Sequence, residues 1–388
     1  MTLAFERTRA FAVCIGVALG AIAAPASAQA PIDIRAVDTL MLRLMATYHA
    51  PGAAVVLIKG GATVLQKSYG VRDLTTRAPV TAQTLFNIGS ISKSFTALAI
   101  AQMVDQNKLD LDTPIIGYVP DLRLSEPRVT RTVTLRRLLS HASGLPPDEQ
   151  WPRQVPPNRQ EIIREFATMP ITAEPGTRFQ YCSRCTVLAA YALERVSGQP
   201  WETYTRAHIF APLGMTTASF GASGLERSSD GARPYQHRSI LGNVQVPWGR
   251  LAYLDPLSPA AGIDASIEDL SRYALFQLGD GMILGRRLVS AQMMGQLHRP
   301  EIAVDPSWTS APIQDLHAAL GWFTGEHRGV RLMYHNGVNP GFRAAIVLVP
   351  SAKAGVVILT NGDSSKFTEA ATLSLVEQLL SDEAGAPR

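Results

Sequence analysis

The sequence predicts an α+β fold, in which one antiparallel sheet flanked by helices accompanies a mostly helical lobe. Two observations lead to this prediction. β-Prone runs lie near both ends of the chain, at 53–69 and 330–360, whereas the long middle shows helical periodicity broken by proline-rich loops. Strands from both ends can share one sheet that the helices cover. With 388 residues, 46% of them apolar, the chain can bury one large core or two joined lobes.

The individual elements follow in chain order. Apolar residues at helical spacing over 34–45 predict an amphipathic first helix. The runs 53–59 and 62–69 predict two strands joined at Gly60-Gly61, because glycine tolerates the positive φ of a tight turn. Three further strands are expected at 330–335, 342–349 and 355–360, followed by a closing helix over 367–380. We therefore expect a mixed α/β lobe from about 29–89 and 300–388, and a helical lobe over about 90–299.

The first residues predict export. Arg7 and Arg9 precede an apolar run at 10–24, and the small residues that end at Ala28 fit a signal-peptidase site. The apolar run is shorter than the ~20 residues that a membrane-spanning helix needs. Residues 1–28 are therefore expected to be a cleaved signal peptide, which leaves a periplasmic or secreted protein without a stable membrane anchor.

The cysteines indicate a disulfide more than a metal site. Once Cys14 leaves with the signal, Cys182 and Cys185 remain, and an oxidising compartment favours a bridge between them. Two unpaired thiols remain an alternative. A single Cys-x-x-Cys lacks the further ligands of a structural zinc site, and the sequence has no His-Glu-x-x-His for a catalytic metal. We expect no metal and no cofactor.

The charge pattern argues against nucleic acid as a partner. The formal net charge is only +4, and the basic residues are scattered along the chain instead of forming a stripe or a tail. The expected partner is a small-molecule or peptide substrate. The sequence does not predict an oligomeric state.

The strongest local motif is Ser90-x-x-Lys93, followed by apolar residues at helical spacing. Residues three apart share a helix face, so the Lys93 amine can reach the Ser90 hydroxyl. An amine activates a serine only if its pKa is lowered, and burial and the positive end of a helix both act in that direction. The backbone N–H of Ser90 would also favour an oxyanion. Taken alone, the pattern is better explained by a chance match, with a capping serine and a solvated lysine at an exposed helix start.

A second candidate segment places Tyr181 on the loop before an apolar helix. A tyrosine beside a lysine ammonium can lose its proton more easily, and it can then pass the serine's proton to a leaving group. A bridge between Cys182 and Cys185 would stiffen this loop. A buried aromatic that only packs its ring is the alternative.

The third segment is His335-Asn336-Gly337 at a strand end. We expect the glycine to let a substrate backbone lie along the strand edge and pair with it. By itself, a histidine at a strand end is more often an ordinary structural residue.

In this order the three segments resemble the group of class C β-lactamases, D-alanyl-D-alanine carboxypeptidases and family VIII esterases, which are penicillin-recognising serine hydrolases. The Ser-x-x-Lys motif is typical of β-lactamases and penicillin-binding proteins. The similarity extends through 138–145, 212–215 and 261–263. The resemblance implies a β-lactamase/transpeptidase-like fold and an acyl-enzyme on Ser90 without a cofactor. It also implies catalysis by Ser90, Lys93 and Tyr181, and substrate binding by Ser183, His335, Asn336 and Gly337.

Two positions depart from the pattern of that group. Ser183 stands where its second motif usually has asparagine, and a hydroxyl offers one donor where an amide offers two. His335 stands where its β-lactamases have lysine, and a neutral imidazole holds a substrate carboxylate less firmly. We therefore expect an esterase or D-peptidase. The alternatives are a β-lactamase and a penicillin-binding sensor with little turnover, so the substrate is an ester, a D-peptide or a β-lactam.

Overall fold

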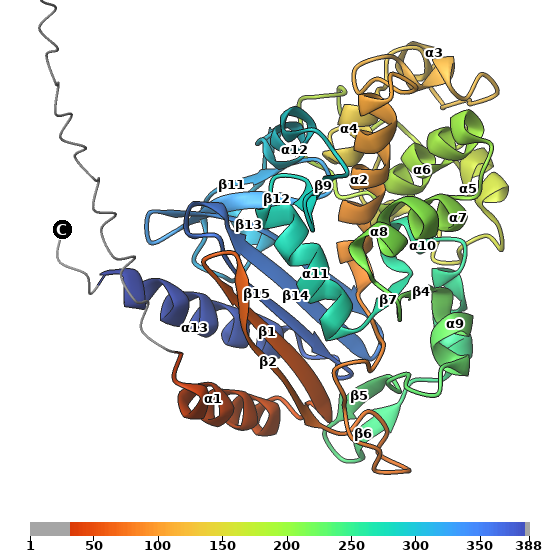
Figure 1. The fold of residues 1–388 in the computed structure, drawn as a ribbon. Coiled ribbons are helices and arrows are strands. Elements are labelled where there is room, and N and C mark those ends of the chain that lie inside the picture. Colours follow the sequence, from red (N-terminus) through yellow and green to blue (C-terminus); the bar gives the residue numbers. More distant parts are fainter. Residues whose placement is uncertain (1–31, 385–388) are drawn as a thin grey trace, which may run out of the picture. The chain divides into compact units, whose positions relative to one another are not determined.

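The structure is a computed structural model that describes residues 32–384, and its centre is one antiparallel sheet (Figure 1). The strand order β10-β11-β12-β13-β14-β15-β1-β2 joins the N-terminal strands to the last strand of the chain. The predicted sheet from both chain ends is therefore confirmed. Its strands are β1 (Gly52–Lys59), β2 (Ala62–Gly70), β10 (Ile302–Ala303), β11 (Gln314–Ala318), β12 (Phe323–His327), β13 (Val330–Asn339), β14 (Phe342–Val349) and β15 (Ala354–Thr360).

The sheet differs from the prediction at one edge. Strands β10 to β12 were not expected, and β13 continues to Asn339, four residues beyond its predicted end. Strand β12 pairs with β13 only as far as Tyr334. Beyond that point β13 pairs with β14 alone, so its last residues, 335–339, form a free edge.

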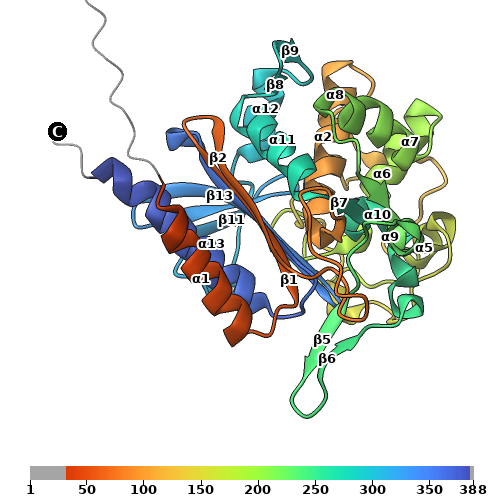
Figure 2. The same cartoon turned by 60° about the horizontal axis from the view of Figure 1, so that its bottom comes forward.

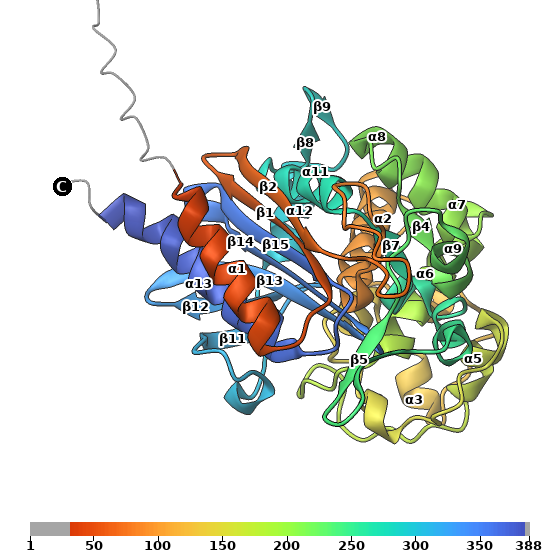
Figure 3. The ribbon, with the colours of Figure 1, turned by 90° about the horizontal axis from the view of Figure 1, so that it is seen from below.

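Helices cover both faces of the sheet. The terminal helices α1 (Ile34–Thr47) and α13 (Ser365–Ala384) lie side by side on one face (Figure 3), and α11 (Ile267–Leu278) covers the other (Figure 2). Helix α1 buries Val37 and Met41, which lie four residues apart and therefore on one side of the helix. Both predicted terminal helices are present.

The helical part is built around α2 (Ser92–Asp105). Every residue of α2 from Ser92 to Met103 is buried, as expected of a helix that other helices surround. It packs against α6 (Ser183–Ser197), α10 (Ser258–Ala261) and α12 (Ala291–His298).

The middle of the chain also contains short strands, so it is not helical throughout. Strands β3, β7 and β4 form a small antiparallel sheet next to α2, and β5 pairs with β6 in a hairpin. The remaining elements are α3 (Pro127–Thr130), α4 (Leu135–Leu139), α5 (Arg159–Glu165), α7 (Trp201–Thr205), α8 (Ala211–Leu213), α9 (Gly221–Arg227), β3 (Phe86–Asn87), β4 (Ser219–Phe220), β5 (Tyr235–Arg238), β6 (Gly242–Gln245), β7 (Ile263–Ala265), β8 (Met282–Ile283) and β9 (Arg286–Arg287).

The predicted signal peptide, residues 1–28, lies outside the described residues. Within 32–384, no helix combines the length and the apolar character needed to cross a bilayer.

Candidate active site

A cavity of about 920 Å³ opens where the free edge of β13 meets the start of α2 and α6. It is lined by six of the seven residues that the sequence predicts for the site, and Lys93 is buried directly behind Ser90. These six come from three distant parts of the chain and are Ser90, Tyr181, Ser183, His335, Asn336 and Gly337.

Ser90 and Lys93 are in direct contact. Ser90 lies in a 3₁₀ turn, Gly89–Ile91, that leads into α2, and Lys93 is in the first turn of that helix. The Lys93 Nζ donates to Ser90 Oγ at 2.9 Å and to the carbonyl oxygen of Ala260 at 3.0 Å. Burial lowers the pKa of Lys93 to about 8, and the negative charge of Asp148 acts in the opposite direction. A large fraction of the amine is therefore neutral slightly above neutral pH.

Two glycines allow β13 to approach this turn. Gly89 has a φ of 53°, and a Cβ on it would lie 2.7 Å from the Val338 nitrogen. A Cβ on Gly337 would lie 2.0 Å from the Ile88 carbonyl oxygen. The sequence predicted that Gly337 makes room for a substrate backbone. The structure gives a different reason, which is the close packing of β13 against the serine turn.

The backbone N–H of Val338 is available as a second oxyanion donor. Asn339 and Phe342 flank a two-residue turn, so they form a hydrogen-bonded pair, and the pairs along the ladder alternate in type. Val338 therefore directs its N–H away from β14, across the free edge and next to Gly89. Together with the N–H of Ser90 it can hold a developing oxyanion. No sequence signal marks Val338, because its role depends on strand register.

Tyr181 lies over the lysine. The Lys93 Nζ is 4.8 Å from the centroid of its ring. Burial raises the pKa of the Tyr181 hydroxyl, which a hydrogen bond with Ser90 opposes only in part. The expected lowering of this pKa by Lys93 is therefore wrong for the free enzyme. Tyr181 remains a neutral phenol that can relay a proton, and Lys93 is the better initial base.

His141 holds the segment that carries Tyr181. Its carbonyl oxygen accepts from the Gln180 N–H at 2.7 Å, and its Nδ1 accepts from the Cys182 N–H at 3.1 Å. Its ring also lies against the Tyr181 ring, with 4.4 Å between centroids. His141 therefore fixes the residues on both sides of Tyr181. The sequence offered no specific role for it, although it falls in the matching stretch 138–145.

Ser183 is bonded to a carboxylate. Its N–H donates to Asp148 Oδ1 at 2.7 Å, and its Oγ donates to Asp148 Oδ2 at 2.6 Å. The hydroxyl proton that was expected to serve a substrate is thus already engaged. Asp148 itself lines the cavity, and the sequence did not single it out.

His335 is neutral and only 2% exposed. Burial and the charge of Lys93 lower its pKa to about 3. Its Nδ1 lies 2.8 Å from the carbonyl oxygen of Asn336, which can only accept, so Nδ1 carries the proton. Its Nε2 is then a buried acceptor, and no described residue donates to it.

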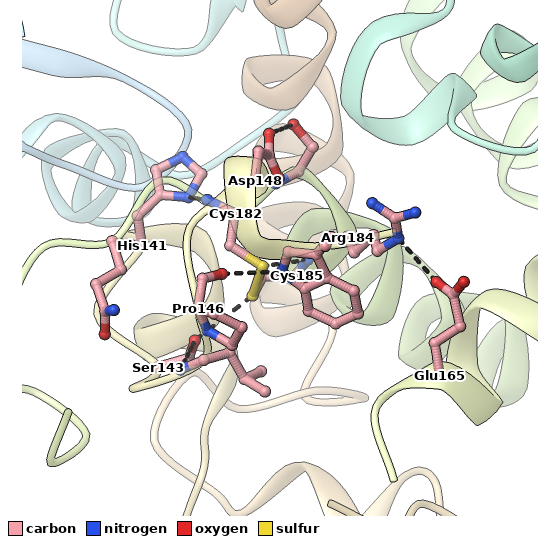
Figure 4. The surroundings of a disulfide bond; sticks show 12 residues. His141, Ser143, Pro146, Asp148, Glu165, Cys182, Arg184 and Cys185 are labelled. Carbon is pink, nitrogen blue, oxygen red and sulfur yellow. Dashed lines mark hydrogen bonds and ion pairs between the residues drawn. A yellow bond between two sulfur atoms is a disulfide. The ribbon is translucent and has the colours of Figure 1, made fainter. Parts of the chain in front are cut away.

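Cys182 and Cys185 form the expected disulfide at the start of α6 (Figure 4). Both cysteines are fully buried, and Cys182 directly follows Tyr181. Within residues 32–384, no group of three or more His, Cys, Asp or Glu side chains is arranged to hold a metal ion.

Comparisons with known proteins find relatives along most of the chain. A family model described as Beta-lactamase matches residues 37–380. Protein flp of Staphylococcus aureus (strain COL) is 26% identical over 331 residues, which are 84% of this chain and 63% of that protein. Penicillin-binding protein 4 of Amycolatopsis lactamdurans is 27% identical over 353 residues, or 88% of each. The solved structure of the octameric penicillin-binding protein homologue from Pyrococcus abyssi has a TM-score of 0.78 at 28% identity, and the match covers 90% of this chain and 78% of that one.

The chain spans less than two thirds of the length of Protein flp, but the family model extends over most of its described residues. The fold and the serine-lysine pair agree with that match. On this evidence the chain belongs to the β-lactamase family.

Proposed function

We propose that this chain hydrolyses an ester or an amide through an acyl-enzyme on Ser90, as an esterase or D-peptidase. The observation that carries the proposal is the 2.9 Å contact between Ser90 Oγ and the buried Lys93 Nζ, at the wall of an open cavity. Burial keeps the lysine pKa close to the working range of a general base.

The chemistry follows from the positions of the groups. Neutral Lys93 takes the hydroxyl proton while Ser90 Oγ bonds to the substrate carbonyl carbon. The N–H groups of Ser90 and Val338 hold the resulting oxyanion. When the oxyanion collapses, the bond to the leaving group breaks, and the proton passes from Lys93 through Tyr181 to the leaving oxygen or nitrogen. Water then attacks the acyl-enzyme by the same route, which releases the acid and restores Ser90.

The acyl site favours this activity over rapid β-lactam hydrolysis. A β-lactam presents a carboxylate, but His335 is neutral and supplies no positive charge to hold it. The second candidate is a penicillin-binding sensor with little turnover. It is supported by the names of two relatives, a penicillin-binding protein and a penicillin-binding protein homologue.

We also propose that the protein is exported and works in the periplasm or outside the cell. The disulfide between Cys182 and Cys185 supports this location, because such bonds persist in oxidising compartments.

Turnover of a p-nitrophenyl ester, with intact-protein mass measurement of the bound acyl group, tests the proposal. Ser90→Ala is expected to lower kcat/KM by about a thousandfold or more and to abolish the mass adduct. Ser381→Ala, on the exposed side of α13, is the matched control and retains both. Stoichiometric labelling by a penicillin without ester turnover would favour the sensor, and full activity of Ser90→Ala would refute the acyl-enzyme.

A further inference from the structure

We propose that the substrate carries a positively charged amino group on its acyl part, and that Asp148 binds this group beside Ser90 while His335 accepts a further hydrogen bond. This inference rests on the proposed function, because it names the substrate class of the same site. The relevant substrates are esters or amides of amino acids with a free amino group.

Asp148 retains hydrogen-bonding capacity that faces the cavity. A carboxylate has about four acceptor sites. Ser183 donates two hydrogen bonds to the Asp148 carboxylate, which leaves about two of these sites for a ligand. The side chain is half-buried and lines the same cavity as Ser90. Its backbone N–H donates to the Tyr181 carbonyl oxygen at 2.9 Å, so the carboxylate is tied to the catalytic segment.

Within the part of the chain that the structure describes, this carboxylate has no directly paired cation, and the charge of Lys93 acts on it only through space. Among residues 32–384, no ion pair involves Asp148. Arg184 is a buried cation that lines the cavity. It pairs with Glu165 at 2.9 Å and also donates to the Pro152 carbonyl oxygen. Figure 4 shows the Arg184 guanidinium directed at Glu165 instead of at Asp148. The negative charge therefore acts on the cavity, where it raises the pKa of both Lys93 and Tyr181.

His335 is an independent second observation. Its Nε2 is an acceptor, is fully enclosed, and has no donor among the described residues, although the residue lines the same cavity. A buried polar atom without a partner is costly, so a ligand that supplies an N–H would remove that cost. A carboxylate with spare acceptor sites and an imidazole nitrogen without a donor among the described residues are complementary to a donor-rich, cationic group.

The same arrangement disfavours anionic substrates. A carboxylate in the acyl site would meet the like charge of Asp148 and the lone pair of His335, and like charges in such a site reduce binding. The competing explanation is that Asp148 only caps the first turn of α6 through Ser183. A purely capping role predicts that Asp148→Asn leaves any dependence on substrate charge unchanged, so the two explanations can be separated.

The test compares two esters of the same shape. Alanine methyl ester, as each enantiomer, carries an ammonium where methyl isobutyrate carries a methyl group, and an α-amino group with a pKa of about 7.7–8.0 is mostly charged at pH 7. We expect wild-type kcat/KM for the better alanine ester to exceed that for methyl isobutyrate by about tenfold or more, which corresponds to ~1.4 kcal/mol. Monomethyl succinate, which is anionic, is expected to be the poorest of the three.

Asp148→Asn is the decisive variant, because asparagine can still accept from the Ser183 N–H and so preserves the cap. The ratio between the alanine ester and methyl isobutyrate is expected to fall about tenfold. Glu226→Gln removes a charge of the same sign from an exposed residue of α9 that does not line the cavity, and it is expected to leave the ratio close to the wild-type value. The ratio cancels any general effect of Asp148 on Lys93, since both esters use the same base.

A salt titration of the wild type keeps the inference testable if Asp148→Asn does not fold. Added salt screens a charge interaction, so the ratio should fall with ionic strength while turnover of methyl isobutyrate changes little. A wild-type ratio near one, an equal ratio in Asp148→Asn, or a ratio insensitive to salt would overturn the inference. None of these outcomes affects the proposed function, which fails only if Ser90→Ala keeps its activity.

Discussion

At the scale of single residues, the protonation of Lys93 should control the rate. Its pKa is lowered to about 8, so the amine is charged below that pH and neutral above it. Because only the neutral amine can take the Ser90 proton, kcat/KM for a neutral ester should rise with pH through an apparent pKa of about 8. A pH-rate profile from pH 5 to 10 measures this rise. Lys93→Arg should be inactive across the whole range, because a guanidinium does not deprotonate in proteins.

Asp148 provides a control for this profile. Its negative charge raises the pKa of Lys93, so Asp148→Asn should move the rising limb to lower pH. A profile that is flat from pH 5 to 10, or a limb that moves to higher pH in Asp148→Asn, would contradict the assignment of Lys93 as the base.

At the scale of elements, the segment before α6 depends on His141 more than on the disulfide. His141 binds the backbone on both sides of Tyr181, whereas the bridge from Cys182 to Cys185 closes a very short loop and so adds little unfolded-state constraint. We expect His141→Ala to lower kcat about tenfold or more with a smaller change in KM, because it misplaces the proton relay. Steady-state kinetics on a neutral ester measures both constants.

His141→Asn is the conservative variant. Asparagine tolerates the left-handed φ of 59° at this position and carries a side-chain acceptor, so it should restore part of kcat. Replacing both cysteines by serine should cost less activity than His141→Ala. A larger loss in the cysteine double variant would instead show that the bridge is the main support of Tyr181, as the sequence suggested.

The success of the sequence prediction depended on how far apart in the chain the interacting parts lie. Ser90 and Lys93 are one helical turn apart, so their spacing predicted that the amine could reach the hydroxyl, and the two side chains are in contact. Val338 and Asp148 act through strand register and a loop fold, which sequence spacing does not encode. The pKa direction of Tyr181 failed for the same reason, because tertiary burial outweighs the neighbouring lysine.

The strands of the main sheet also differ in how well the sequence predicted them. The two β-branched central runs of β1 and β15 are apolar throughout and were found readily. Strands β11 and β12 contain His317 and Gly325, among other residues that weaken a strand pattern, and they form because β13 supplies a partner to β12, which in turn pairs with β11. Strands of this kind become visible only when the sheet is assembled.

At the scale of the whole molecule, the site forms because strands from the two ends of the chain pair in one sheet. Strand β15 pairs with β1, and β14 then places β13 against the serine turn. The contact is reinforced by Asn339, whose side-chain Nδ2 donates to Asn87 Oδ1 at 2.5 Å and to the Ala261 carbonyl oxygen at 3.1 Å. We call this contact between β13 and the serine turn the seam. Global stability and the geometry of the site are therefore coupled through the seam.

A buried carboxyl group beside this seam should make stability depend on pH. Asp264 is fully buried in β7, accepts from Asn87 Nδ2 at 3.0 Å and from Ser219 Oγ at 3.1 Å, and has its pKa raised to about 8 by burial. In the unfolded chain its pKa is about 3.9, so between these values the folded state binds a proton that the unfolded state lacks. Stability from this group is therefore complete below about pH 4 and is lost as the pH rises toward 8.

We therefore expect the melting temperature of the wild type, relative to that of Asp264→Asn, to fall between pH 5 and 8.5, because this difference cancels groups such as His335 and Lys93 that titrate in the opposite sense. Calorimetric melting at constant ionic strength measures it. Asp121→Asn, which removes one carboxylate from the surface, should keep the wild-type slope and thereby separate burial from net charge. An unchanged slope in Asp264→Asn would mean that Asp264 does not hold its proton in the folded protein. In that case the hydrogen bonds from Asn87 and Ser219 would have to stabilise a carboxylate, and the seam would carry a buried charge at neutral pH.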